Sequence, residues 1–286
     1  MSPLTDRQVF GIAVILYGIS AVYSIFLLRR EKRHHNRLNY FLLLSALVAH
    51  TYAMVLSGFS LKACPINSLY GATTFISWTM VAAYLVIGLF HKLRFLGSYV
   101  APLLFAIGVF ALFTPRHVSQ GTPNFTGGWG SLHIAAFTLA YAAWALSAVA
   151  GAMYLTQERD LKMHKLRAVL SLMPPIQRLE TVTNRLLVGG FALFTVGLIV
   201  SVTFAHHGEF TMRGDFKVIW AGFVWLLYLG LILMRWKFWR GRRFAVSAIG
   251  ACAFVLLTFW GSSLMSPSHD PRGSLVPDNT SPQAGQ

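Results

Sequence analysis

Acidic residues and cysteines are both scarce in this sequence, and their scarcity excludes several classes of protein. Only 9 of the 286 residues are Asp or Glu, and no carboxylate pair, HExxH motif, glycine-rich phosphate loop or convincing Ser-His-Asp order occurs. Acid–base catalysis therefore has few candidate groups. Cys64 and Cys252 are the only cysteines, and neither belongs to a CxxC or CxxCH motif. The chain is therefore neither a thiol-redox protein nor itself a c-type cytochrome, and we expect both cysteines to be small packing residues.

Charge is also scarce, because 12% of the residues are charged whereas 55% are hydrophobic. A soluble domain of this size could not cover so much apolar surface, so lipid must form part of its solvent. Backbone groups in hydrocarbon must be satisfied within each segment, which favours helices, and the apolar runs are too long for the strands of a barrel. We predict an all-α polytopic membrane helix bundle with about eight spans, at residues 8–28, 40–58, 70–90, 96–113, 131–155, 186–205, 219–234 and 244–264.

The net charge of +15 is placed as in a membrane protein and not as in a nucleic-acid-binding protein. Alternate connections between the predicted spans, at residues 29–39, 91–94, 156–185 and 235–243, hold 18 of the 24 Lys and Arg residues. Cytoplasmic connections of multi-pass proteins are enriched in these residues. We therefore expect a multi-pass protein of the cell inner membrane with both termini outside and no nucleic-acid partner. Membrane lipid, through anionic headgroups, is the expected partner of the inner charges.

Residues 1–265 are predicted to form one membrane domain without clear internal repeats. The first apolar run lacks a basic segment before it, so we interpret it as a retained helix and not as a cleaved signal peptide. Residues 266–286 are rich in Pro, Ser, Asp, Asn and Gly and are expected to be a disordered polar tail. Within the longest inner connection, apolar residues at helical spacing predict an interfacial helix at residues 161–173.

Two histidines at membrane depth are the main candidate ligands. His133 follows the glycine- and tryptophan-bearing segment 127–131 at the outer start of the fifth predicted span, where an imidazole is placed to bind heme iron axially. His50 lies inside the second span, where a buried histidine needs a partner or a cofactor. At both positions the alternative is a structural histidine that is hydrogen-bonded to a neighbouring helix.

The outer connection at residues 206–217 is unusually polar for so apolar a protein. His206 and His207 are adjacent and cannot both face one metal, so one of them is a candidate second axial ligand, with solvated loop histidines as the alternative. The charged side chains nearby either pair with each other or hold heme propionates, and Trp220 is either part of this site or part of an interfacial aromatic belt. These charged residues are Arg213, Asp215 and Lys217.

Several spaced groups of residues together carry a family resemblance. They are Leu132-His133-Ile134 with Ala140-Tyr141, Met173-Pro174-Pro175 with Leu179-Glu180, and Asp215, Lys217, Trp220, Trp225, Tyr228, Arg235 and Trp239-Arg240-Gly241. In these groups the chain resembles the cytochrome c assembly family, the multi-span heme-handling proteins of c-type cytochrome maturation. Within that family it is most similar to the eight-span HemX-like and YpjD-like branch. The resemblance is strongest from residue 129 to residue 261.

The sequence departs from the family pattern at the heme-presenting motif. Met212 and Gly214 stand where heme-handling members have tryptophans, and Phe216 and Val218 replace a proline and a glutamate. A second outer histidine is expected where Ser263-Leu264-Met265 stands, so Met265 and His269 are the alternatives for that ligand.

The resemblance implies that heme, b-type and non-covalent, is bound or handed on at the outer face. In this hypothesis His133 is an axial ligand, His50 is an in-membrane ligand or relay site, and the charged residues of the outer connection lie near the propionates. Thioether attachment would need a partner with reduced apocytochrome thiols, so the chain is expected to act with other cytochrome c maturation subunits and apocytochrome c and not as an enzyme by itself.

Two other functions are compatible with the sequence. A scaffold or regulator of heme metabolism would keep the fold without stable heme binding, and His133→Ala would then affect only stability. A small-solute transporter would show substrate-dependent flux and favours broken helices in paired halves, which the sequence does not show. The altered heme-presenting motif and the absence of repeats favour the scaffold over the transporter.

Overall fold

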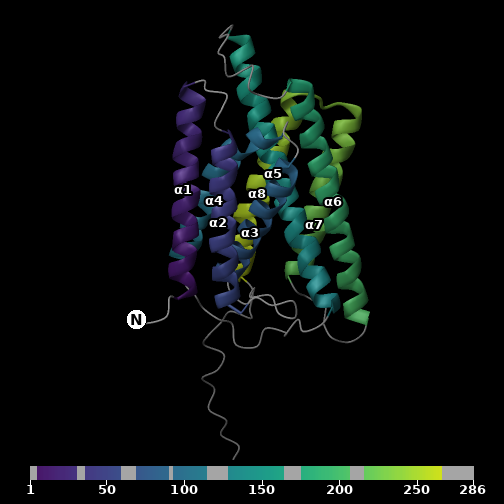
Figure 1. Cartoon of the computed structure of the whole chain (residues 1–286). Helices are drawn as coiled ribbons and strands as arrows, with labels where there is room; N and C mark the ends of the chain where they lie inside the picture. Colours follow the sequence, from purple (N-terminus) through teal and green to yellow (C-terminus); the bar gives the residue numbers. More distant parts are fainter. Residues whose placement is uncertain are drawn as a thin grey trace, which may run out of the picture.

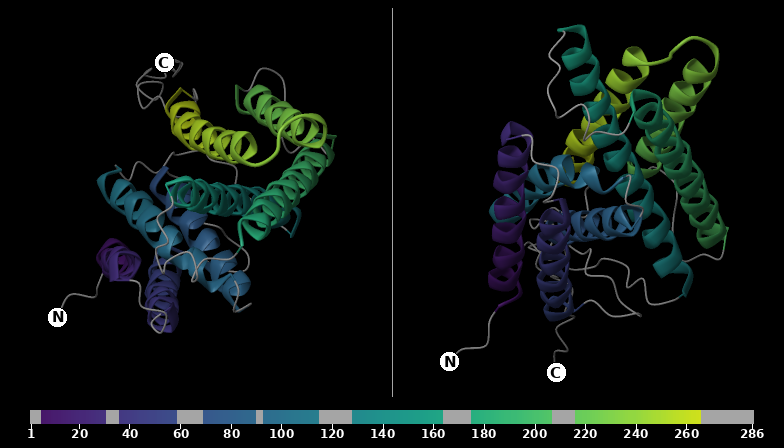
Figure 2. Two further views of the ribbon diagram at one scale, coloured as in Figure 1. Left: turned by 90° about the horizontal axis from the view of Figure 1, so that it is seen from above. Right: turned by 45° about the horizontal axis from the view of Figure 1, so that its top comes forward.

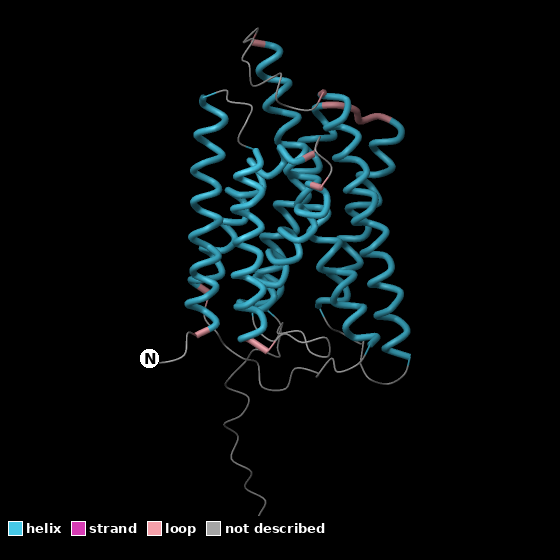
Figure 3. The backbone as a smooth tube through the Cα atoms, viewed as in Figure 1, coloured by secondary structure: helices cyan, strands magenta, loops and turns pink. Residues whose placement is uncertain are grey.

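The apolar runs of the sequence fold as helices in a computed structural model that describes residues 5–30, 36–58, 69–89, 93–114, 128–163, 175–206 and 216–265. Within these ranges the protein is all-α, without a β-strand, as Figure 3 shows. The helices are α1 (Asp6–Arg30), α2 (Asn36–Leu56), α3 (Leu69–Gly88), the short 3-10 helix η2 (Arg94–Leu96), α4 (Gly97–Phe113), α5 (Gly128–Lys162), α6 (Ile176–His206), α7 (Phe216–Lys237) and α8 (Arg242–Met265).

These helices confirm the predicted polytopic membrane bundle. In the described part of the chain, 7 helices, α1 to α7, are long and apolar enough to cross a membrane. The last helix, α8, has 24 residues and packs along α5. Each of the eight predicted spans corresponds to one of the eight long helices, because a continuous apolar run of this length satisfies its backbone groups in hydrocarbon only as a helix.

The two helices around the longest inner connection extend well beyond the predicted spans. The apolar run of α5 ends near Leu155, but the helix continues to Lys162, where Lys162 Nζ pairs with Glu158 Oε1 at 2.7 Å. On the other side of the connection, α6 already begins at Ile176. Residues 161 and 162 therefore form the last turn of α5 and not the start of a separate interfacial helix, and residues 164–173 of that predicted helix lie outside the described part.

Helix α5 is the central element of the bundle. It lies between α1–α4 on one side and α6–α8 on the other, as the view from above shows (Figure 2). One large buried cluster, which includes Tyr17, Leu43, Tyr84 and Leu146, joins α1–α4 to α5. A second cluster, built around Trp144, joins α5 to α6, α7 and α8. Helix α5 thus lies at the boundary between two packed groups of helices.

The ends of the bundle differ in charge. The last turns of α1, α3, α5 and α7 and the first turns of α2, α4, α6 and α8 lie at one end, which we call the basic end because it carries described cations such as Arg94, Arg159, Arg178 and Arg242. The start of α1 and the end of α8 both lie at the opposite end (Figure 1). His133 is near the start of α5 and therefore near this opposite end.

Candidate functional site

The His133 side chain is held in place by helix α6. Its Nδ1 lies 3.2 Å from the backbone oxygen of Gly197, and its ring meets the Phe137 ring edge-on with centroids 4.8 Å apart. A carbonyl oxygen can only accept a hydrogen bond, so Nδ1 must carry the proton. In the neutral imidazole the other nitrogen, Nε2, then keeps its lone pair. The ring is thus in the tautomer that can ligate a metal through Nε2.

Glycines of α6 allow the close approach that this hydrogen bond needs. A Cβ atom at Gly197 would lie 2.8 Å from the Phe137 ring, and one at Gly190 would lie 2.6 Å from the Trp144 ring. Small residues let two membrane helices bring their backbones together, which is the usual basis of tight helix pairs in lipid. The α5–α6 interface is therefore shaped by aromatic side chains of α5 that pack on bare backbone of α6.

An aromatic cluster continues from His133 toward the middle of the bundle. The Phe137 ring packs edge-on against Phe194, with centroids 4.6 Å apart, and Trp144 stacks on Tyr228 of α7 with centroids 3.5 Å apart. The Trp144 indole also donates to the backbone oxygen of Leu187 at 3.2 Å. These contacts pack the half of α5 that carries His133 against α6 and α7.

His50 is fully buried within the membrane-spanning part of α2. Its Nδ1 lies 3.0 Å from the Tyr17 hydroxyl of α1, and the Phe10 ring lies beside it with centroids 4.8 Å apart. Among the described residues, Nε2 makes no hydrogen bond of normal geometry, although the backbone of Thr74 is near the ring. A buried polar atom without a partner is costly in an apolar setting. His50 is therefore in a position where a further partner for Nε2 would be favourable.

The two histidines occupy separate positions in the bundle. His50 contacts α1 and lies beside α3, whereas His133 is bonded to α6. These contacts place the two predicted ligands in different helix pairs and do not join them in one coordination site within the described structure. If both bind heme, each must do so in its own surroundings.

Only part of the predicted outer site lies within the described structure. The Trp220 ring packs near Phe254 of α8 with centroids 5.6 Å apart, and its buried Nε1 has no hydrogen-bond partner among the described residues. His206 is the last residue of α6 and Lys217 lies in the first turn of α7. The structure describes the backbone of these two residues but not their side chains. His207, Arg213 and Asp215 also lie outside the described residues.

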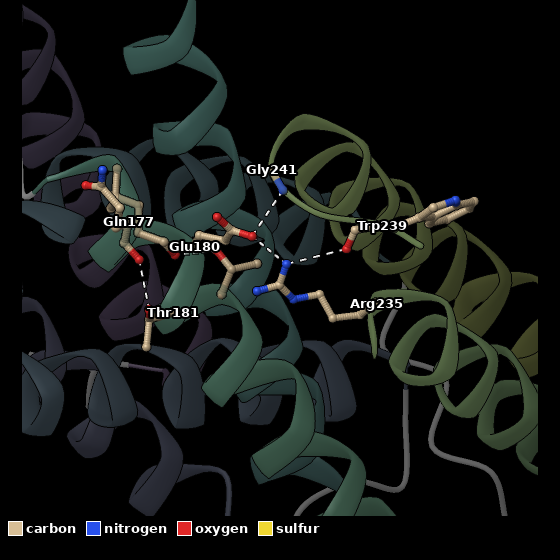
Figure 4. Close-up of polar contacts among 8 residues, drawn as sticks. Gln177, Glu180, Thr181, Arg235, Trp239 and Gly241 are labelled. Atoms are coloured by element: carbon tan, nitrogen blue, oxygen red, sulfur yellow. Dashed lines mark hydrogen bonds and ion pairs between the residues drawn. The ribbon is translucent and has the colours of Figure 1, made fainter. Parts of the chain in front are cut away.

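A polar cluster at the basic end was not predicted from the sequence. One carboxylate oxygen of Glu180 on α6 accepts hydrogen bonds from Arg235 of α7 and from the backbone nitrogen of Gly241, the latter at 3.1 Å (Figure 4). The same Arg235 nitrogen also lies 3.4 Å from the backbone oxygen of Trp239. Glu180 and Arg235 are 55 positions apart, and only the packing of α6 against α7 and α8 brings them together.

Comparisons with known proteins all indicate one family. A family model described as "Cytochrome C assembly protein" matches residues 66–269. The cytochrome c biogenesis protein CcsA of Prochlorococcus marinus (strain MIT 9215) is 25% identical over 226 residues, which covers 70% of this chain and 73% of the relative. The CcsA protein of Synechococcus elongatus is 24% identical over 249 residues, with 70% and 76% covered.

A third relative covers more of the chain. The protein named HemX of Brevibacillus brevis is 24% identical over 254 residues, which covers 88% of this chain and 93% of the relative. The family match extends from the connection before α3 to just beyond α8, and it therefore contains His133, Trp220 and the Glu180–Arg235 pair. With more than half of its length matched by the family model, this multi-pass helical chain belongs to the cytochrome c assembly protein family.

Proposed function

We propose that this protein binds b-type heme non-covalently at the end of the bundle where α5 begins, and that His133 is an axial ligand. The observation that carries this proposal is the hydrogen bond between His133 Nδ1 and the Gly197 carbonyl, at 3.2 Å. It fixes the tautomer and the orientation of the ring, as backbone carbonyls commonly do for metal-ligating histidines. When bound, heme would supply the iron porphyrin that cytochrome c biogenesis must deliver.

Heme is a large, flat and mostly apolar ligand with two carboxylates, and the end of the bundle where α5 and α7 begin carries groups suited to such a ligand. The aromatic side chains of α5 and α6 offer apolar packing, and the buried Trp220 Nε1 is a hydrogen-bond donor without a partner in the described structure. In this proposal Arg213 and Lys217, with Asp215 between them in sequence, would supply positive charge for the propionates. His206, His207, Met265 and His269 are the alternatives for a second axial ligand.

His50 is proposed to serve as a second, in-membrane ligand or as a relay site. Its Nε2 makes no hydrogen bond of normal geometry among the described residues, although the Thr74 backbone is near the ring, while Tyr17 holds Nδ1 at 3.0 Å. This support is independent of the His133 site, because the two rings contact different helices. A His50 substitution should therefore change a different component of heme binding.

Attachment of heme to apocytochrome c would require other components. The chain has two cysteines, far apart in sequence, and the described one, Cys252, is buried in α8. We therefore propose that this chain presents or relays heme at the outer face of the inner membrane. Other maturation subunits would bring the reduced apocytochrome thiols to that face.

A membrane scaffold or regulator of heme metabolism is the second candidate. The observation that favours it is the replacement of the expected tryptophans of the outer motif by Met212 and Gly214. In that case His133 and Gly197 would serve only to pair α5 with α6. The fold would be kept and stable heme binding would be lost.

An absorption spectrum of the detergent-purified protein from heme-replete cells distinguishes these functions. We expect a Soret band and sharp bands in the reduced state, and we expect His133→Ala to remove or shift them while the protein stays folded and monodisperse. His50→Ala should leave the His133-dependent bands in place. A colourless, monodisperse wild-type protein that also fails to take up added heme would contradict the heme proposal and support the scaffold.

A further inference from the structure

The turn between α7 and α8 has one well-defined shape. Helix α7 ends at Lys237 and α8 begins at Arg242, and Gly241 between them has a φ of +61°. A Cβ atom at this position would lie 2.7 Å from the Tyr154 hydroxyl of α5. Both the left-handed backbone and this contact favour glycine, so the turn lies tightly on the end of α5.

Glu180 anchors the turn and also neutralises one of its charges. Its carboxylate pairs with Arg235 and accepts the Gly241 N–H, and the Arg235 guanidinium lies 4.7 Å from the centroid of the Phe244 ring. Figure 4 shows Trp239 contributing its backbone oxygen to this cluster while its indole ring points away. The charge of Arg235 is therefore satisfied inside the protein.

The turn, together with the helix ends that flank it, exposes unpaired cations and aromatic rings. Trp236 is 83% exposed and Phe238 is 71% exposed. Four exposed cations lie beside them and form no ion pair with any residue of the described structure: Lys237, Arg240, Arg242 and Arg243. Exposed aromatic rings and uncompensated cations are thus combined within one short, anchored segment.

We propose that this turn is a binding site for the headgroup of an anionic phospholipid. Cations at the end of a membrane helix attract anionic headgroups, and tryptophan and other aromatic rings favour the level of the headgroups. The turn joins two helices of the bundle at the basic end (Figure 1). The apolar span of α7 ends at Lys237, so Trp236 and Phe238 lie at the end of a membrane span, where the headgroups of a bilayer are expected. A soluble acidic protein would pair with the cations, but it would not explain why exposed aromatic rings lie beside them at the end of a membrane span.

The test is a lipid titration of the full-length protein in zwitterionic nanodiscs or detergent. Native mass spectrometry would count bound phosphatidylglycerol and phosphatidylcholine molecules and give their relative affinities. We expect a preference for phosphatidylglycerol, and the triple variant Arg240→Gln/Arg242→Gln/Arg243→Gln should weaken its binding by roughly tenfold or more, given the attraction of each surface cation to anionic lipid. Glycerol 3-phosphate should not compete, because it lacks the acyl chains.

A matched control separates a site in the turn from general attraction to the basic end. Arg37→Gln/Arg159→Gln/Arg185→Gln removes the same number of exposed arginines from α2, α5 and α6. It should change the affinity for phosphatidylglycerol only slightly. Trp236→Ala/Phe238→Ala keeps every charge and should still weaken binding several-fold, with an unchanged melting temperature as evidence of folding.

Three results would overturn the proposal. One is equal weakening by the two arginine variants, which would indicate diffuse electrostatic attraction. Another is equal binding of phosphatidylglycerol and phosphatidylcholine by the wild type, which would leave an acidic protein as the partner of the turn. The third is full competition by glycerol 3-phosphate, which would indicate a site for soluble phosphate esters.

Discussion

The hydrogen bond from His133 to Gly197 depends on the missing side chain at residue 197. In Gly197→Ala the added Cβ would lie 2.8 Å from the Phe137 ring, so Phe137 or α6 must move away. We expect a destabilisation of about 1–3 kcal/mol, as for other overpacked positions. Because His133 is bonded to the same backbone, the absorption bands of bound heme should also shift. Thermal unfolding and visible spectra of the purified protein measure both effects.

The control for this substitution is a glycine of the same helix. A Cβ atom at Gly189 would meet nothing within 4 Å. Gly189→Ala should therefore leave the spectrum unchanged and stabilise the helix by up to about 1 kcal/mol. Equal behaviour of the two variants would show that the space at Gly197 does not determine the position of His133.

Tyr17 and His50 form a hydrogen-bonded pair, so we expect the effects of substituting them on the free energy of unfolding to be non-additive. Tyr17→Phe removes the hydroxyl that lies 3.0 Å from His50 Nδ1 and leaves a second nitrogen of the buried ring without a partner. We expect a loss of about 1–3 kcal/mol. In the double variant Tyr17→Phe/His50→Leu no polar atom of the pair remains buried, so it should be more stable than the sum of the two single variants predicts. A thermal-unfolding double-mutant cycle measures the difference, and additive losses would contradict the coupling.

At the basic end, one carboxylate joins α6, α7 and the α7–α8 turn. Glu180→Gln would remove the charge that pairs with Arg235 and weaken the bond to Gly241 N. Since both side chains are only 21–23% exposed, we expect a loss of about 1–2 kcal/mol and faster proteolysis in the α7–α8 turn. Glu158→Gln breaks an i,i+4 pair within α5 whose Lys162 side chain is 63% exposed and should cost no more than about 0.5 kcal/mol. Similar losses in the two variants would show that Glu180 does not anchor the turn.

The helices themselves were predictable, because the apolar runs determine them. Their ends were less so: α5 continues through Thr156, Glu158 and Lys162, which carry no apolar signal but are compatible with a helix outside the hydrocarbon. The contacts between helices were not predictable. Tyr17 is 33 positions from His50, and His133 is 64 positions from Gly197. Each pair forms only because of how the helices pack. The sequence identified His133 as a candidate, but only the structure shows which nitrogen is bonded.

At the scale of the whole molecule, His50 lies outside the residues that the family model matches. The match begins at residue 66, so α1 and α2 precede the matched range, and His50 lies in this pair. Ser20 and Ser24 of α1 both donate to the Asn39 oxygen of α2, which together with Tyr17 and His50 sets the register of the two helices. The α1–α2 pair therefore has its own polar core, and its proposed role does not follow from membership of the family.

The orientation of the bundle decides whether the end that carries His133 can serve apocytochrome c. The excess of Lys and Arg in alternate connections predicts that the basic end is cytoplasmic and that Cys64, in the connection before α3, is outside. In right-side-out membrane vesicles an impermeant maleimide should therefore label Cys64, whereas Cys252 is buried in α8 and should remain unlabelled. In a variant without the native cysteines, Arg240→Cys should react only after the vesicles are permeabilised. The reverse pattern would place His133 on the cytoplasmic side, and heme bound there could not be presented to an apocytochrome outside the membrane.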